Sequence, residues 1–203
     1  MLEGRNLSFR YHPKKDWILK NISLTVSPGQ VIGLKGMSGE GKTTLGKIMA
    51  GYLRPDSGFI QVDKYPLPKK GVSPVQMIFQ HPELSVNPKW RIHKILSEGI
   101  AGNQTLLMDE FGLSPSFLNR YPHELSGGEL QRIVIGRSLG KDTRYLIADE
   151  ITAMLDAITQ AQIWHTIMTS IKKRNIGVLA ISHDENLLNR ICDDCLHIRD
   201  LNN

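Results

Sequence analysis

A glycine-rich segment near residue 40 has the composition and spacing of a loop that binds phosphate groups. It fits the pattern G-x-x-x-x-G-K-[ST] and reads Gly36-Met37-Ser38-Gly39-Glu40-Gly41-Lys42-Thr43-Thr44. Glycines let backbone N–H groups turn toward phosphate oxygens, and a following helix adds the positive end of its dipole. We expect Lys42 to reach the β- and γ-phosphates and the Thr43 hydroxyl to ligate Mg²⁺. Glu40 is unusual in such a loop, and we expect it to point to solvent because a carboxylate facing the phosphates would repel them.

Two consecutive acids, Asp149 and Glu150, end an apolar segment that begins at Tyr145. Alone, such a segment is weak evidence, because a strand that ends in acids often only caps the next helix. It gains weight because the phosphate-binding pattern lies about 100 residues upstream. We then expect Asp149 to hold Mg²⁺ and Glu150 to polarise an attacking water. Successive side chains of a strand point in different directions, so the two acids can serve these two purposes.

A third motif begins at Leu125 and reads Leu125-Ser126-Gly127-Gly128-Glu129-Leu130-Gln131-Arg132. The residues alone indicate only that Ser-Gly-Gly opens a helix, which is a second possible anion site. The motif resembles the signature motif of ABC ATPases. In that family this segment of one subunit closes over the γ-phosphate bound to the phosphate loop of another, and the resemblance implies this role for Ser126, Gly127 and Gly128.

Further motifs of that family follow in the family's order, so the resemblance covers nearly the whole chain. Gln80 follows the apolar segment 75–79, as the Q-loop glutamine does. Asp156 stands in the D-loop position shortly after Glu150, and His183 stands where the switch histidine does. Tyr11 lies 25 residues before Gly36, where the family has an aromatic residue that stacks on adenine. Each has a plainer alternative: Tyr11 could be an edge-strand aromatic, Gln80 a surface amide and His183 a strand-end histidine.

The resemblance implies an ATPase in which two cassettes bind two ATP molecules head to tail. Thr43, Asp149 and Gln80 would organise Mg²⁺, Glu150 would activate water, and His183 would contact the γ-phosphate. The implied catalytic residues are Glu150, His183 and Gln80. The implied nucleotide-binding residues are Tyr11, Gly36, Met37, Ser38, Gly39, Glu40, Gly41, Lys42, Thr43, Thr44, Ser126, Gly127, Gly128 and Asp156.

A closer likeness is to the ATPase subunits of peptide and nickel importers. The local matches are Phe79-Gln80-His81-Pro82, Asn87-Pro88 and Arg120-Tyr121-Pro122-His123-Glu124. The likeness implies a second cassette, identical or paralogous, separate permease subunits, and indirectly a solute-binding protein. The solute would be a peptide or a nickel or metal-chelate compound.

The chain also departs from the pattern of these ATPases. His81 replaces the usual acid after the Q-loop glutamine, and Met154 is bulky for a segment that crosses a tight subunit interface. The segment around Met154 reads Ile151-Thr152-Ala153-Met154, where Pro-Thr-Ser-Ala is commoner. The C-terminal extension common in this subfamily is also not expected.

The elements that would hold these residues alternate along the chain. Short strands come first, with strand periodicity in Leu7, Phe9 and Tyr11. Strands are expected at 31–34, 59–62, 75–79, 145–148 and 178–181, helices at 157–174 and 185–191, and another strand-like segment at 196–198. Such alternation predicts a parallel sheet covered by helices. We therefore expect an α/β fold, the P-loop NTPase core of an ABC ATPase, as a single domain over residues 1–203 with an early antiparallel β subdomain and a helical insertion at about 82–124.

Composition narrows the class of protein further. The 203 residues are 40% hydrophobic, which suits a folded core, and the net charge of +5 suits anionic partners without choosing among them. The chain has no Lys/Arg block and no apolar run near the roughly 18 residues of a membrane helix. We expect a protein at the cytoplasmic face of the membrane, held by its permease, with no nucleic-acid partner. Two alternatives remain: a soluble ABC ATPase acting on DNA or ribosomes, and a P-loop kinase or GTPase.

Two cysteines, Cys192 and Cys195, are the only ones in the chain. A zinc site usually needs four ligands, and there is no second cysteine pair to supply them. A redox role would favour a CxxC motif at the start of a helix, whereas this pair leads into an apolar segment. We expect two reduced structural thiols.

Overall fold

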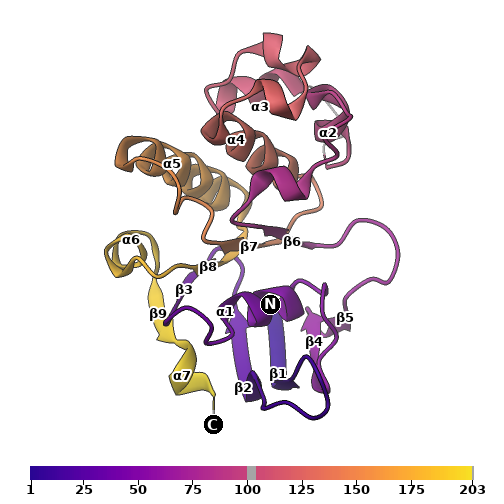
Figure 1. The fold of residues 1–203 in the computed structure, drawn as a ribbon, viewed down its shortest axis with the longest axis vertical. Helices are drawn as coiled ribbons and strands as arrows, with labels where there is room; N and C mark the ends of the chain where they lie inside the picture. Colours follow the sequence, from indigo (N-terminus) through magenta and orange to yellow (C-terminus); the bar gives the residue numbers. More distant parts are fainter. Residues whose placement is uncertain (100–103, 203) are drawn as a thin grey trace.

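Two β-sheets and a layer of helices make up the protein, which we describe from a computed structural model that covers residues 1–99 and 104–202 (Figure 1). The first sheet is antiparallel, with the strand order β2-β1-β4-β5. Its strands are β1 (Leu2–Phe9), β2 (Leu19–Val26), β4 (Ser57–Val62) and β5 (Tyr65–Pro66). This sheet is the early antiparallel subdomain that the alternating residues predicted.

The second sheet is parallel and has the order β6-β7-β8-β3-β9. Its strands are β3 (Val31–Lys35), β6 (Val75–Ile78), β7 (Tyr145–Asp149), β8 (Gly177–Ile181) and β9 (Asp194–His197). Every residue of β7 and β8 is buried, because elements packed on both faces exclude water from a parallel sheet. The carboxyl ends of parallel strands meet at one edge, which is where ligands bind in open α/β sheets.

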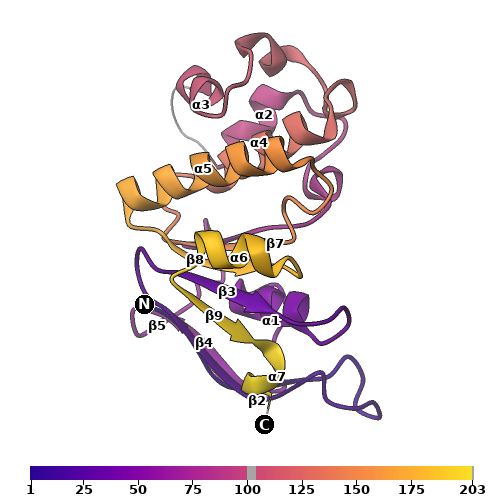
Figure 2. The same cartoon turned by 90° about the vertical axis from the view of Figure 1, so that its left-hand side faces the viewer.

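Helix α1 (Lys42–Met49) lies between the two sheets, as both views show (Figures 1 and 2). Its buried residues Leu45, Ile48 and Met49 pack in one apolar cluster with side chains of both sheets. The antiparallel sheet therefore fixes α1 against the parallel sheet, and with it the loop that precedes α1.

A second apolar cluster joins the other face of the parallel sheet to a helical layer at the far end of the molecule (Figure 2). This layer comprises η1 (Pro82–Ser85), α2 (Ile92–Ser97), α3 (Gln104–Glu110), η2 (Pro115–Asn119), η3 (Pro122–Glu124), α4 (Gly127–Ser138) and α5 (Ala157–Arg174). The predicted insertion at 82–124 falls within it, with residues 100–103 outside the described part. Helix α4 packs against α2, so the segment that opens with Ser126 belongs to this layer as well.

The C-terminal part of the chain comprises α6 (Glu185–Ile191), β9 and α7 (Ile198–Leu201). The predicted strand at 196–198 is wrong at its end, because His197 accepts a hydrogen bond from the Arg199 N–H (3.2 Å) and caps α7 there. The strand periodicity that included Tyr11 also reached too far, since β1 ends at Phe9. Within the described residues, we find no helix with the length and apolar character needed to cross a membrane.

Candidate functional site

The glycine-rich loop joins β3 to α1, as its motif requires. Gly41 precedes the helix with φ +97°, and a Cβ there would lie 2.9 Å from Ile18 Cγ2 and 3.0 Å from Leu19 Cδ2. Only glycine fits this turn without strain. No side chain caps the start of α1, so its first-turn N–H groups have no side-chain partner there. The helix start therefore offers donors to an anion.

Lys42 opens α1 and its side chain turns back over the loop. Its Nζ donates to the carbonyl oxygens of Gly36 (2.7 Å) and Met37 (2.8 Å). The residue is buried, 7% exposed, and yet it lines the cavity described below. The ammonium group is thus held at the loop, as a phosphate-binding lysine needs to be.

Thr43 and Asp149 meet where the start of α1 faces the end of β7. The Thr43 hydroxyl donates to Asp149 Oδ1 over 3.0 Å, although the two residues are 106 positions apart. Burial raises the pKa of Asp149 above its ordinary value, the hydrogen bond from Thr43 opposes that shift, and the charge of Glu150 adds to it. A hydroxyl and a buried carboxylate are the oxygen ligands that Mg²⁺ accepts, so these two groups suit a Mg²⁺ site.

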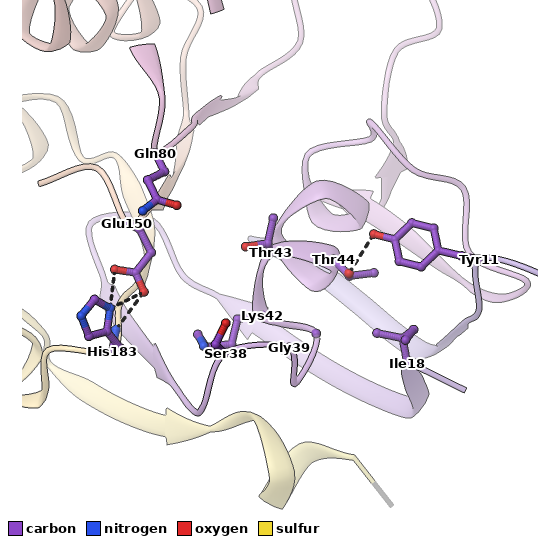
Figure 3. A pocket seen from close by; sticks show the side chains of 11 residues that line it. Tyr11, Ile18, Ser38, Gly39, Lys42, Thr43, Thr44, Gln80, Glu150 and His183 are labelled. Carbon is purple, nitrogen blue, oxygen red and sulfur yellow. Dashed lines mark hydrogen bonds and ion pairs between the residues drawn. The ribbon is translucent and has the colours of Figure 1, made fainter. Parts of the chain in front are cut away.

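Glu150 and His183 form a pair at the ends of β7 and β8 (Figure 3). Glu150 has a left-handed backbone (φ +53°), and its N–H donates to Ile181 O at 2.9 Å. One carboxylate oxygen accepts from the His183 N–H (3.0 Å), and His183 Nδ1 lies 2.9 Å from both oxygens. The Glu150 side chain is 14% exposed and that of His183 is 69% exposed. The acid is therefore fixed, while the imidazole reaches solvent.

Tyr11 and Ile18 form the opposite wall, on the segment between β1 and β2 (Figure 3). Tyr11 is 61% exposed, and its hydroxyl is hydrogen-bonded to Thr44 Oγ1 (3.1 Å). Its ring also packs edge-on against Phe9, with the centroids 5.0 Å apart. An exposed ring with a fixed position can stack on a flat, apolar ligand group.

These walls enclose an open cavity of about 600 Å³. Its lining consists of Tyr11, Ile18, Ser38, Gly39, Gly41, Lys42, Thr43, Thr44, Gln80, Glu150 and His183. Gln80, just beyond β6, lines the same cavity as Glu150 (Figure 3). Sequence reasoning missed Ile18, because an isolated isoleucine before a strand carries no pattern of its own.

Several predicted residues lie outside this cavity. Gly36, Met37 and Glu40 belong to the phosphate loop without lining it, and Asp149 lies beneath Thr43. The expectation that Glu40 points to solvent is wrong: its side chain is 14% exposed and pairs with Arg199. The reason is that α7 packs beside the loop and brings a cation to it.

Ser126, Gly127 and Gly128 do not line the cavity either. Ser126 caps α4 in the helical layer: its N–H donates to Glu129 Oε2 (2.7 Å), and its hydroxyl accepts from the Glu129 N–H (3.4 Å). Asp156 caps α5, accepting from the N–H groups of Ile158 and Thr159 at 3.0 Å. The Thr159 hydroxyl also donates to Asp156 (2.6 Å), and this hydrogen bond together with the backbone ones holds the pKa of Asp156 below its ordinary value. Within this one chain the two segments serve as helix caps.

The two cysteines are free thiols beside β3. Burial raises the pKa of Cys192 to about 12, and the neighbouring Cys195 adds to the shift. A Cβ on Gly33 would lie 3.0 Å from each sulfur, so the thiols fill the space beside this glycine. A thiol with so high a pKa is inert at neutral pH.

Fold and loop together define a P-loop nucleoside triphosphatase, and comparison with known proteins narrows the class. Residues 19–153 match the family model described as ABC transporter. The chain is 34% identical to the nickel import ATP-binding protein NikE of Staphylococcus aureus strain RF122, covering 98% of this chain and 87% of that protein. It is 33% identical to the oligopeptide transport ATP-binding protein OppF of Streptococcus mutans, covering 95% of this chain and 70% of that protein.

Solved structures show the same fold. The ABC transporter cassette MJ0796, solved as a dimer, superposes with a TM-score of 0.81 at 22% identity, covering 98% of this chain and 95% of that one. The chain belongs to the ABC transporter family, and within it resembles the ATP-binding subunits of peptide and nickel importers. It is an ATPase cassette.

Proposed function

We propose that the chain is the ATP-hydrolysing subunit of an ABC importer, and that residues 1–203 act as one ATPase domain that drives separate permease subunits. The observation that carries this proposal is the cavity, which gathers the phosphate loop, Gln80, Glu150 and His183 from four separate parts of the chain. A cavity of about 600 Å³ is within the usual range for a site that takes a ligand the size of a nucleotide.

ATP fits the two ends of the cavity by its chemistry. Lys42 and the uncapped start of α1 supply positive charge and N–H donors for the triphosphate. Tyr11 offers an exposed aromatic face on which adenine can stack. The hydrogen bond between its hydroxyl and Thr44 holds the ring near the start of α1. Tyr11 would thus bind the face of the adenine ring, while the phosphate loop would bind the negatively charged phosphates.

Thr43 and Asp149 would hold Mg²⁺, with Gln80 close by. The ion would neutralise charge on the β- and γ-phosphates. Before it binds, the Thr43 hydroxyl donates to Asp149 and so keeps the buried carboxylate in place. Among the described residues no cluster of three or more His, Cys, Asp or Glu could hold a metal, so the proposed site depends on hydroxyl, carboxylate and amide oxygens.

Glu150 is proposed as the group that takes a proton from the attacking water. Its carboxylate is held by the N–H and Nδ1 of His183, which fixes its direction without neutralising it by a lysine or arginine. His183, which is more exposed, is proposed to contact the γ-phosphate. The general base, Glu150, and the residue that would orient the phosphate, His183, then follow two neighbouring strands of one sheet, β7 and β8.

A second cassette, identical or paralogous, is proposed to supply the other side of the nucleotide site through its own Ser126, Gly127 and Gly128. In this chain Ser126 and Gly127 are exposed, and a Cβ on Gly127 would meet no atom within 4 Å. Two large apolar side chains near Asp156 are also exposed, Met154 at 66% and Ile158 at 72%. Exposed apolar groups beside the signature suit an interface between cassettes.

The permease is proposed to bind the groove between the core and the helical layer. This groove has a volume of about 490 Å³ and includes Phe79, Leu84 and Tyr52 among its lining residues. Leu84 is 80% exposed and Tyr52 59% exposed, so the groove offers apolar side chains to a helix of the partner. The protein would then lie at the cytoplasmic face of the membrane, and a solute-binding protein would deliver a peptide or a nickel or metal-chelate solute, as the names of NikE and OppF suggest.

Calorimetric titration of MgATP tests the site. Lys42→Ala should weaken binding by roughly 10²- to 10⁴-fold, because it removes a buried charge from the phosphates. Lys172→Ala, on the exposed face of α5, is the matched control and should bind as the unaltered protein does. Equal affinity of the Lys42→Ala variant would remove the assignment.

Co-expression with permease subunits, sought among the products of neighbouring genes, tests the role in transport. The chain should be retained on membranes only when these permeases are present, and washing should not remove it. Membrane retention without permeases would contradict attachment through the permease. Recovery with ribosomes or DNA instead would contradict the importer and favour the soluble alternative.

A further inference from the structure

The acid of the phosphate loop, Glu40, turns away from the cavity and toward the C-terminal helix α7. One oxygen of its carboxylate accepts from the Met37 N–H (2.7 Å), and the other lies 2.5 Å from Arg199 Nε. The Glu40 side chain is 14% exposed, whereas that of Arg199 is 64% exposed. A residue 159 positions away in the sequence therefore supplies the counter-charge to an acid of the phosphate loop.

Helix α7 is held beside this loop by more than the ion pair. Ile198 is 1% exposed, and a Cβ on Gly36 (φ +153°) would lie 2.6 Å from both Ile198 Cγ2 and Glu40 Oε2. At the end of α7, the capping residue Asn202 accepts a hydrogen bond from the Lys20 N–H (2.6 Å) and donates one to Ile18 O (3.4 Å). The helix thus contacts both the phosphate loop and the strand segment that forms the cavity wall.

The charge of Glu40 needs such a partner. Burial opposes its ionisation, but the Met37 amide and Arg199 together hold the pKa of this carboxyl below its ordinary value, so it is ionised at neutral pH. An ionised carboxylate two positions before Lys42 would repel a triphosphate on the same loop. Lys42 does not offset it directly, because its Nζ donates to the carbonyls of Gly36 and Met37.

We infer that Arg199 is a positioning residue for nucleotide binding: it neutralises Glu40 and holds that side chain off the phosphate-binding face of the loop. Arg199 does not itself line the cavity, and it touches the loop at two residues: its Nε pairs with Glu40, and its Nη2 donates to Met37 Sδ (3.3 Å). Of these two contacts, only the one with Glu40 is between charges, so the effect of Arg199 on bound phosphate is proposed to act through Glu40. The inference rests on the proposed ATP site, and it adds a requirement that the phosphate-loop motif does not contain. Nucleotide affinity should depend on Arg199 only while residue 40 carries a negative charge.

A double-mutant cycle read by calorimetric titration of MgATP and MgADP tests this. Arg199→Met should raise the dissociation constant about three- to tenfold, since it frees one unit charge near the phosphates at a partly exposed site. Glu40→Gln should bind at least as tightly as the unaltered chain, because the amide oxygen still accepts from Met37. In the Glu40→Gln background, Arg199→Met should change the constant less than about twofold. Arg190→Met, at the exposed end of α6, is the matched control for loss of a positive charge.

The outcomes separate this inference from the proposed function. If neither the unaltered chain nor Glu40→Gln binds MgATP, the ATP site itself fails. If both bind and Arg199→Met is harmless, or equally harmful in both backgrounds, the coupling through Glu40 is overturned. A large loss in Glu40→Gln alone would also overturn it, because Glu40 would then act on the nucleotide itself. Should Arg199→Met not fold, Arg199→Gln enters the same cycle, since it keeps a polar side chain on α7 and removes the charge.

Discussion

Replacing Glu150 by glutamine separates binding from the chemical step. Glutamine has the size of glutamate and keeps an oxygen that can accept from the His183 N–H, which donates to Glu150 at 3.0 Å. What it loses is the charge and the ability to take a proton. The structure therefore predicts a folded variant that binds MgATP and closes onto its partner cassette but turns over slowly.

The two effects of this change differ in size. The Glu150 carboxylate is hydrogen-bonded to His183, so weakening those side-chain hydrogen bonds should cost about 1–2 kcal/mol of stability. For a chain of this length that lowers the melting temperature by about 2–8 °C. Loss of a general base costs roughly 10²–10⁴-fold in rate, which is about 2.7–5.5 kcal/mol of barrier. Turnover should therefore fall far more than stability.

The assay pairs the turnover rate with the dimer fraction on a sizing column, in MgATP and with the proper partner cassette. Glu150→Gln should accumulate as dimer while its turnover drops, and Glu185→Gln, an exposed acid on α6, is the control for loss of one carboxylate. Asp149→Asn should instead bind MgATP weakly and stay monomeric, because Asp149 is the proposed Mg²⁺ ligand beneath Thr43. Near-normal turnover of Glu150→Gln would refute the general-base role, and loss of its MgATP binding would reverse the roles of the two acids.

Two further predictions concern the walls of the site. Tyr11→Ala should weaken the binding of ATP and GTP alike, by about 1–3 kcal/mol. Tyr11→Phe should lose little affinity, because only the hydrogen bond to Thr44 (3.1 Å) disappears. Competition against a labelled nucleotide measures both variants, and a loss confined to one base would indicate a hydrogen bond to the edge of that base. Ser126→Arg should leave MgATP binding by the isolated chain almost intact and reduce turnover of the dimer. If the cassette forms homodimers, mixing the Ser126→Arg variant with the Lys42→Ala variant should restore some activity, because a mixed dimer keeps one intact site. Absence of recovery despite proven mixing would contradict the composite site.

The sequence predicted the elements that carry a short, local pattern. Strand β7 and helix α5 have the bounds that the apolar runs indicated to within one residue, because a run of buried side chains is visible in the sequence itself. The phosphate loop could be located for the same reason: its glycines, Lys42 and Thr43 lie within one stretch of nine residues. The parallel sheet then brought Glu150 and His183 together, since β7 and β8 are neighbours.

The sequence could not predict contacts between side chains that only the fold brings together. Glu40 was expected in solvent because a carboxylate that faces the phosphates would repel them, but the fold brings it a partner, Arg199, from α7, a four-residue helix. That helix was itself missed, since Leu196 to Ile198 reads as the continuation of a strand until His197 caps it. Ile18 became part of the cavity only through the path of the segment between β1 and β2.

The buried and exposed residues of the proposed site differ in whether a single chain holds them in place. Lys42, Thr43 and Glu150 are held by hydrogen bonds within the chain, so one chain builds the side of the cavity that is proposed to receive the phosphates. Ser126, by contrast, is exposed on the helical layer and bonded only to its own helix. The second cassette proposed above would complete the site on this exposed side. Because the helical layer also lines the groove proposed for the permease, movement of this layer would couple the proposed closure over nucleotide to the membrane partner.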